Sequence, residues 1–290
     1  MLGKLKRKYY QWNTRRAGQR HIDGLEEVLA GTDPMLLVHQ MGRAGSMTTV
    51  NSLRQVGIDM PVYHTHWLNP ETIDGRKHLT AHLPEARHPL NMRVARRIAE
   101  ELKREGTKRR LWKLVTVFRE PVARNISVFF LSIDAFVDDF ERRYARGELS
   151  HQQLLDVFLE KFPHDQPLEW FDREVRDVFG IDVYDQEFPK EKGYQVIRSD
   201  RVDLLLIAIE QLNRCFHDAF HSFLGVEVPD LVQTHITEKD PTRPMYAEFV
   251  RKVVFPPEYL DRMYGSRFAE HFYTEEQIAA FRKKWGETSV

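Results

Sequence analysis

The sequence predicts an α/β fold in which helices pack on a mainly parallel sheet, with a helix-rich second half. Three observations lead to this prediction. Short apolar segments alternate along the chain with segments whose apolar residues recur at helical spacing. The apolar segments are nearly continuous, which is typical of parallel strands buried on both faces. Finally, 42% apolar and 30% charged residues give a chain of 290 residues enough material for a large core under a solvated surface.

The first half of the chain is predicted to contain three strands, each followed by a helix. These strands are the apolar segments 34–41, 60–68 and 111–118. The helix after the first strand begins at Ser46 and ends at Gly57, because glycine is a frequent stop signal. The helix after the second strand stops before Gly106. Pro121 suits the first turn of the third helix, whose apolar positions continue to Phe140.

The second half is predicted to be mostly helical around one further strand. Capping boxes open two helices, at Ser150 and at Thr274, each with a glutamine three residues later, and the second helix reaches Trp285. Between them, 203–209 is a buried strand that leads into a helix over 212–223. Strands that alternate with helices indicate βαβ units, so ligands are expected at the carboxyl ends of the strands.

The first 22 residues differ from the rest of the chain. They contain seven Lys or Arg residues, no acid, and three aromatic residues. We therefore expect a basic arm over 1–22 and a single domain over 23–290. Such an arm can bind RNA or an anionic membrane surface, or it can be a plain mobile arm or surface helix. The whole chain has no net charge, so no nucleic-acid partner is expected and any anion site must be local.

Cysteine content and apolar run length predict a soluble, cytoplasmic protein. Cys215 is the single cysteine and cannot form an internal disulfide, which favours a reducing compartment. The longest apolar run, 204–209, is far shorter than the roughly 20 residues that span a bilayer. No apolar segment follows the first basic residues, as it would in a signal peptide.

The segment QMGRAGSMTT, at 40–49, follows the first predicted strand and opens a helix. Gly42 and Gly45 allow a tight turn, and the first amides of a helix attract anions. Arg43 adds a positive charge, while Ser46 and Thr48 add hydroxyl groups. The spacing differs from G-x-x-x-x-G-K-[ST], the phosphate loop of nucleoside triphosphatases. The segment is either an anion site or a plain tight turn before a helix.

A second polar group of residues follows the strand at 111–118. Arg119 stands at the strand end, where a cation is otherwise costly, and Ser127 lies two helical turns later. Together they could hold one phosphate through charge-assisted hydrogen bonds, with Arg124 between them. The alternative is a surface ion pair between Arg119 and Glu120. Two anion sites at neighbouring strand ends would suit a ligand that is phosphorylated at both ends.

The two loops together resemble the nucleotide-binding elements of sulfotransferases that use 3′-phosphoadenosine-5′-phosphosulfate (PAPS). GRAGS at 42–46 resembles their P-K-S-G-T-T loop, and FREPVARNIS at 118–127 resembles their 3′-phosphate element. YHTHWL at 63–68 is similar to the K-T-H-L-P stretch that carries the catalytic histidine. LLLIAIEQLN at 204–213 is similar to the late strand and E-D-L stretch of many sulfotransferases.

The wider sequence resembles a bacterial sulfotransferase-like group labelled capsular polysaccharide synthesis proteins. PLEWFDREVRDVFGIDVY and FYTEEQ carry this resemblance, which covers roughly 34–285. It implies a three-layer, P-loop-like fold of the sulfotransferase type and transfer of a sulfuryl group to a hydroxyl, on a carbohydrate acceptor. PAPS would be the co-substrate, and no metal would be needed. A kinase-like phosphotransferase is the alternative enzyme, although it would need a lysine in its phosphate loop.

The resemblance also assigns roles to individual residues. Arg43, which stands where the family usually has lysine, would bind the 5′-phosphosulfate and neutralise the leaving oxygen. Gly45 and Ser46 would add backbone and hydroxyl hydrogen bonds. Arg119 and Ser127 would hold the 3′-phosphate. Met47 and the Arg251-Lys252 pair depart from the family pattern: Met47 replaces a threonine, whose part falls to Thr48 or Thr49, and Arg251-Lys252 lacks the glycine of the R-K-G element.

The resemblance places His66 on the catalytic base. A base at the attacking hydroxyl needs a pKa near 7, which histidine meets without tuning. His64 lies two residues earlier, on the same strand face, and could orient the substrate. The alternatives are hydrogen-bonded structural histidines, a glutamate base elsewhere, or a zinc pair completed by one of His78, His82 and His88. Three aromatic residues could stack on a sugar or pack in the core: Trp67, Trp170 and Phe171.

Overall fold

The computed structural model describes residues 17–55, 58–75, 89–107, 109–228 and 243–287. Two features of the sequence therefore lie outside the described residues. One is most of the basic arm. The other is the set of downstream histidines considered above as zinc ligands, namely His78, His82 and His88.

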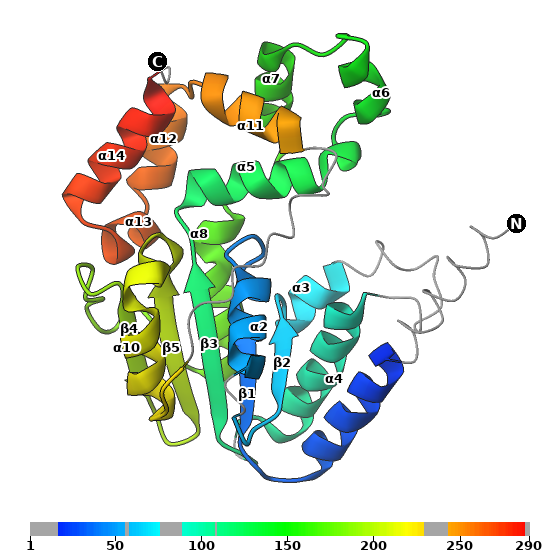
Figure 1. The fold of residues 1–290 in the computed structure, drawn as a ribbon, viewed down its shortest axis with the longest axis vertical. Coiled ribbons are helices and arrows are strands. Elements are labelled where there is room, and N and C mark those ends of the chain that lie inside the picture. Colours follow the sequence, from blue (N-terminus) through cyan, green and yellow to red (C-terminus); the bar gives the residue numbers. More distant parts are fainter. Residues whose placement is uncertain (1–16, 56–57, 76–88, 108, 229–242, 288–290) are drawn as a thin grey trace, which may run out of the picture.

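One five-stranded sheet forms the centre of the molecule, with the strand order β2-β1-β3-β5-β4 (Figure 1). The strands are β1 (Met35–His39), β2 (Val62–Thr65), β3 (Trp112–Phe118), β4 (Tyr194–Arg198) and β5 (Val202–Ala208). The first three strands and β5 run parallel, whereas β4 pairs with β5 in the antiparallel sense at one edge. The predicted α/β class and mainly parallel sheet are confirmed; β4 was not predicted.

Helices make up most of the remaining described structure. A helix over 17–30 precedes β1. The helices of the first half are α2 (Ser46–Gln55), α3 (Pro70–Gly75), α4 (Leu90–Glu105) and α5 (Pro121–Leu131). Those of the second half are α6 (Phe140–Ala145), α7 (His151–Lys161), α8 (Gln166–Phe171), α9 (Asp177–Phe179), α10 (Leu212–Leu224), α11 (Arg243–Lys252), α12 (Pro257–Tyr264), α13 (Arg267–Phe272) and α14 (Glu275–Gly286). Short 3₁₀ turns cover Ile133–Ala135 and Ile209–Gln211, and a π-helical turn covers Asp172–Arg176.

Helices cover both faces of the sheet. On one face, α2 and α10 pack against strand residues that include Val38 and Val115 (Figure 1). On the other face, helix 17–30, α4, α8 and α13 pack against Leu37, Leu114 and their neighbours. A further apolar cluster, built by α5, α7, α11, α12 and α14, lies beyond the carboxyl end of β3. Helices α5, α7, α11, α12 and α14 therefore stand over the sheet edge where ligands were expected.

The helix predicted from Pro121 to Phe140 is wrong in its length. Helix α5 ends at Leu131, and a 3₁₀ turn and a loop separate it from α6. The hydroxyl of Ser132 donates to the carbonyl oxygen of Val128, at 2.8 Å. Serine side chains compete with the backbone for such hydrogen bonds, which weakens helix continuation. The apolar residues beyond Leu131 still enter the core, but from shorter elements.

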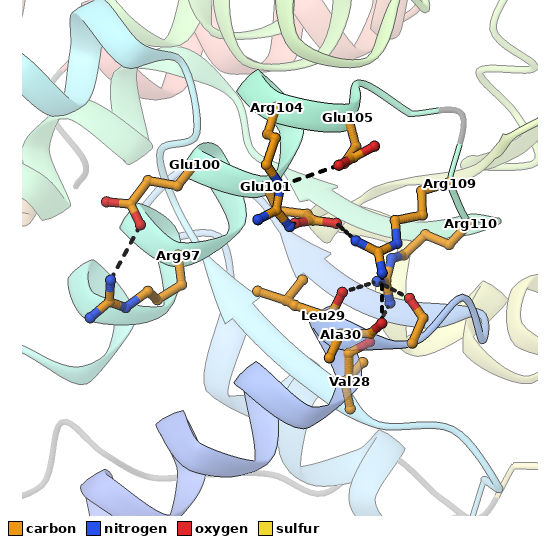
Figure 2. Close-up of polar contacts among 11 residues, drawn as sticks. Val28, Leu29, Ala30, Arg97, Glu100, Glu101, Arg104, Glu105, Arg109 and Arg110 are labelled. Carbon is orange, nitrogen blue, oxygen red and sulfur yellow. Dashed lines mark hydrogen bonds and ion pairs between the residues drawn. The ribbon is translucent and has the colours of Figure 1, made fainter.

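Helix 17–30 is fixed to the body of the protein by Arg110, which precedes β3. The Arg110 side chain is 1% exposed and donates to the carbonyl oxygens of Val28 and Leu29, each at 2.9 Å (Figure 2). A guanidinium group at a helix C-terminus satisfies carbonyl groups that lack intrahelical partners. The helix extends across residue 22, the boundary predicted for the basic arm, and Ile22 is buried in the core.

No helix among the described ranges combines the length and the apolar character that a membrane crossing requires.

Candidate functional site

The order of the strands creates a switch point between β1 and β3. After β1 the chain continues through α2 to β2 on one side, and after β3 it continues through helices to β4 and then β5, both on the other side. The loops after β1 and β3 therefore diverge from neighbouring strand ends. Open α/β sheets bind ligands in the crevice that such diverging loops leave. Both sequence-predicted anion loops are at this position.

The loop after β1 has an unusual backbone. Arg43 and Gly45 have φ angles of 70° and 77°, both in the left-handed region. Arginine rarely adopts this conformation, and non-glycine residues held in it are frequent at ligand sites. At Gly45 a Cβ would also make a tight contact, because it would lie 3.2 Å from the Ile209 side chain, which would have to shift slightly. Helix α2 starts directly afterwards, with the amide of Thr49 donating to the Gly45 carbonyl oxygen at 3.1 Å.

Three hydroxyl side chains follow Gly45 within the first four residues of α2. Ser46 and Thr48 are half-buried on the first turn. Thr49 is buried, and its hydroxyl group donates to the carbonyl oxygen of Gly45 at 3.2 Å. Of the two threonines considered as substitutes for Met47, Thr49 therefore supports the loop backbone, while Thr48 lies nearer to the surface. Met47 itself is 38% exposed.

The loop after β3 presents side chains rather than helix amides. Glu120 is 2% exposed and caps α5, since its carboxylate accepts hydrogen bonds from the amides of Val122 and Ala123, at 2.8 and 2.9 Å. These first amides of α5 are already satisfied. Arg119 of this loop and the hydroxyl group of Ser127, on α5, remain as the groups that can hold an anion here.

The structure brings Arg43, Arg119 and Ser127 together. Arg43 Nε donates to Ser127 Oγ at 2.8 Å, across 84 positions of sequence. Arg119 Nη1 donates to the carbonyl oxygen of Arg43 at 3.4 Å. Within the described ranges Arg119 has no ion pair shorter than 4 Å, and the Glu120 carboxylate is bound elsewhere, so the predicted alternative of an Arg119–Glu120 surface pair is not formed. The result is two half-buried guanidinium groups and a hydroxyl at one switch point.

His66 follows β2 and contacts the start of the β1 loop. Its Nδ1 lies 2.7 Å from the carbonyl oxygen of Gln40. A carbonyl oxygen can only accept, so in neutral His66 the proton is on Nδ1 and Nε2 carries the lone pair. The Gln40 side chain in turn donates to the carbonyl oxygen of Ala44, at 2.8 Å. His66 is thus linked to the candidate anion loop through Gln40. In this tautomer its Nε2 atom is the one that can accept a proton.

His64 lies beside His66, as their spacing predicted. Their ring centroids are 4.5 Å apart, with the rings nearly perpendicular. Burial, followed by the proximity of His66, lowers the pKa of His64 to about 3. Burial also lowers the pKa of His39, on β1, to about 3. Both rings are therefore neutral at physiological pH. Within the described ranges no group of three His, Cys, Asp or Glu residues has the arrangement of a metal site.

Residues 166–176 hold the segment that follows β2. Trp170 Nε1 donates to the carbonyl oxygen of His66 at 3.2 Å, and the Glu174 carboxylate accepts from the amides of Leu68 and Asn69. Glu174 is 1% exposed and belongs to the π-helical turn after α8. Such turns are rare in proteins, and those that do occur are often found at functional sites. Sequence reasoning assigned no role to Glu174, because Glu169, Asp172 and Asp177 lie close by and no local pattern distinguishes Glu174 from them.

Comparison with known families adds one finding. Residues 147–274 match the model of a family, NKWYS, described as "Putative capsular polysaccharide synthesis protein". The match covers less than half of the chain and supports the capsular-synthesis group that the sequence resembles. No curated protein and no solved structure matches the chain. Trp170 and Glu174 lie inside the matched segment, whereas Arg43, His66 and Arg119 lie outside it.

A polar network whose members, apart from Glu210, are buried lies beside Arg119. Glu210 follows β5, and its carboxylate accepts hydrogen bonds from the Glu120 amide at 2.9 Å and from the Tyr273 hydroxyl at 3.2 Å. Glu210 therefore has a structural hydrogen-bonding role at the end of β5. Glu120 itself also accepts from the Tyr264 hydroxyl at 2.7 Å and from Trp285 Nε1 at 2.9 Å. From the sequence, Glu120 was considered only as an ion-pair partner of Arg119, and its place at the centre of this network was not predicted.

Glu210→Gln is expected to change how stability depends on pH. The residue is solvent-accessible, but protein atoms surround its carboxyl group, and this desolvation raises the pKa to about 7. The unfolded chain releases this proton near pH 4.5, so the folded state loses stability as pH rises between about 4.5 and 7. Glutamine removes that loss. The difference in Tm, variant minus wild type, should rise by about 2 to 4 °C from pH 5 to pH 8, the shift that roughly 1 kcal/mol produces.

Thermal unfolding at the two pH values measures this difference. Glu275→Gln, which changes an exposed acid in the first turn of α14, is the matched control and should show no such rise. A constant difference for Glu210→Gln across the range would contradict the raised pKa.

Proposed function

We propose that this protein is a sulfotransferase that moves a sulfuryl group from PAPS to a hydroxyl group of a carbohydrate. The observation that carries the proposal is the meeting of Arg43, Arg119 and Ser127 at the switch point, with His66 joined to the same loop through Gln40. A donor with phosphate at both its 3′ and 5′ positions needs two cationic groups close together, and this arrangement supplies them. The resemblance of both loops to sulfotransferase elements supports the same reading.

The residues fit the donor by their charge and by their donor groups. Arg43 and the first turn of α2, at Ser46, would take the 5′-phosphosulfate, because the helix N-terminus and the guanidinium group both favour an anion. Arg119 and Ser127 would take the 3′-phosphate. Since Arg43 already donates to Ser127, the bound phosphates would replace this hydrogen bond by bonds to phosphate oxygens. Gly45 would let the backbone approach the donor closely.

His66 would act as the base of the transfer. Its Nε2 lone pair accepts the proton of the acceptor hydroxyl while that oxygen forms a bond to sulfur. The bond between sulfur and the 5′-phosphate oxygen breaks, and Arg43 neutralises the negative charge that appears on this oxygen. The products are the sulfate ester, 3′-phosphoadenosine-5′-phosphate and a protonated His66. The carbohydrate acceptor is supported by the family description of the matched segment.

Arg119→Ala is expected to weaken binding of 3′-phosphoadenosine-5′-phosphate about 10- to 100-fold, since a charge-assisted hydrogen bond contributes about 1.5 to 3 kcal/mol. Calorimetric titration measures the dissociation constant of the bisphosphate, with ATP and 5′-AMP as comparison ligands. The wild type should bind the bisphosphate in the micromolar range and more tightly than either. Ser127→Ala should reduce the preference for the bisphosphate over 5′-AMP, whereas Arg43→Ala should weaken the binding of both.

Arg54→Ala is the matched control. Arg54 is an exposed arginine in the last turn of α2, roughly 12 Å along the helix from Ser46, so its loss should leave donor binding unchanged. Two results would contradict the proposed function. One is a wild type that binds the bisphosphate no better than 5′-AMP. The other is equal weakening by Arg54→Ala and Arg119→Ala, which would indicate only a diffuse electrostatic attraction.

A further inference from the structure

A large cavity opens beside the candidate site, at the residue after His66. Its volume is about 910 Å³, which is large enough for several sugar residues. Trp67 and helix α3 form one wall, α8 and the π-helical turn form a second, and the end of α7 with Arg262 of α12 forms a third. His66 does not line the cavity itself, whereas its chain neighbour Trp67 does.

Three residues that line this cavity also contact the elements that position the candidate site. Trp170 and Glu174 line the cavity and also hold the backbone of the segment that follows β2. Gln166 lines it as well and accepts a hydrogen bond from Arg124, a buried residue of the helix that carries Ser127, at 2.6 Å. A ligand in the cavity is therefore in contact with the elements that fix both His66 and Ser127.

Aromatic and carboxylate side chains give the cavity the chemistry of a sugar site. Trp67 is half-buried at the rim, whereas Trp170 and Phe171 are 1% exposed and pack in the core. Of the three aromatic residues considered for sugar stacking, Trp67 is the one placed to do so. An indole face suits the C–H face of a pyranose ring, and carboxylates are strong acceptors for pairs of sugar hydroxyl groups.

The charged residues of the described lining leave an excess of negative charge. Arg173 pairs with Glu169 at 3.1 Å, and Arg262 Nε donates to Asp165 at 3.0 Å. Glu71 and Glu160 also line the cavity, on α3 and at the end of α7. Both are exposed, and neither has an ion pair within 4 Å among the residues that the structure describes. Two carboxylates therefore face the cavity without a neutralising partner in its described walls.

We propose that this cavity binds the sugar residues of the acceptor next to the reacting hydroxyl, and that it selects sugars without carboxylate or sulfate groups. A neutral sugar, or an amino sugar with a free amine, meets Glu71 and Glu160 favourably. A uronic acid or an already sulfated sugar is repelled by them. This inference rests on the proposed function for its role in catalysis, but the binding preference can be measured without the donor.

The test is calorimetric titration, without nucleotide, of three trisaccharides at pH 6.5: triacetylchitotriose (neutral), the glucosamine trimer (cationic) and trigalacturonate (anionic). We expect the neutral and cationic probes to bind at least tenfold more tightly than the anionic one. Trp67→Ala should abolish binding of all three, while Trp67→Phe retains it. In a Glu71→Gln/Glu160→Gln double variant, the affinity ratio of the cationic to the anionic probe should fall about tenfold.

The matched control is the double variant Glu191→Gln/Glu275→Gln, which removes two exposed acids outside the cavity and should leave the ratio unchanged. The bisphosphate is titrated into the same preparations, so misfolding of a variant is recognised by loss of that binding. The proposal is overturned if no probe binds, if the anionic probe binds as tightly as the others, or if Trp67→Ala leaves binding intact. Selective sugar binding without any bisphosphate binding would keep the cavity assignment and reject the sulfotransferase.

Discussion

Replacing Glu120 by alanine is expected to destabilise the folded protein by about 3 to 5 kcal/mol. The carboxylate caps α5 and accepts hydrogen bonds from Tyr264 and Trp285, whose side chains are 2% and 1% exposed. Alanine removes the cap, at about 1 kcal/mol, and leaves two buried donors unsatisfied, each at about 1 to 3 kcal/mol. Urea unfolding followed by circular dichroism measures the change.

Glu120→Gln keeps the shape of the side chain and one of its acceptor oxygens, so it should cost about half as much. Glu191→Ala, at an exposed acid, should change the free energy of unfolding by less than about 0.5 kcal/mol. A loss below about 1 kcal/mol for Glu120→Ala would mean that water replaces the carboxylate in its hydrogen bonds. In that case the network would not be the link between α5, α12 and α14.

His66→Ala is expected to reduce kcat by about 10²- to 10⁴-fold while leaving the affinity for 3′-phosphoadenosine-5′-phosphate within about twofold of the wild type. The reason is that the base acts on the acceptor proton, whereas Arg43, Arg119 and Ser127 hold the donor. The assay follows bisphosphate release from PAPS with triacetylchitotriose as the acceptor probe. Added imidazole should restore part of the lost rate, because it supplies the missing proton acceptor.

The pH dependence of the rate distinguishes a base from a structural histidine. The pKa values of His39 and His64 are lowered to about 3 by burial, so neither ring changes its charge between pH 5 and 8. A fall in wild-type kcat on acidification within this range that His64→Gln retains and His66→Ala loses would therefore be assigned to His66. If His66→Ala weakened donor binding as strongly as kcat, and imidazole restored nothing, His66 would be a support for the Gln40 loop.

The fold was predictable where the signal is local. Largely apolar runs identified β1, β3 and β5, and the strand-like segment 60–68 identified β2. The start signals at Ser150 and Thr274 are capping boxes in the structure. The edge strand β4 was missed because YQVIR alternates apolar and polar residues within a charged stretch, so it lacks the continuous apolar run of a buried strand. The end of α5 was missed because the apolar residues keep their helical spacing past Leu131, so the pattern gives no stop signal there.

The candidate site was predictable only in part. A parallel sheet places the ends of β1 and β3 side by side, so the meeting of their loops follows from the fold class, although the Arg43–Ser127 hydrogen bond does not. Glu174 reaches Leu68 from more than 100 residues away in the sequence. Such contacts depend on how α8 and the turn after it pack, which no local pattern records. The cavity beside Trp67 has the same origin, since its three walls come from parts of the chain that are far apart in the sequence.

The long sequence separations within the Glu120 network also have a kinetic consequence. Glu120 is 144 residues from Tyr264 and 165 residues from Trp285. Contacts that close such large loops form late, because their entropy cost precedes their stabilisation. The sheet and the β1 loop can therefore assemble while α5 still lacks its full set of partners. Changes at Glu120 should mainly accelerate unfolding and hardly slow refolding, so the network would govern how long the assembled site survives.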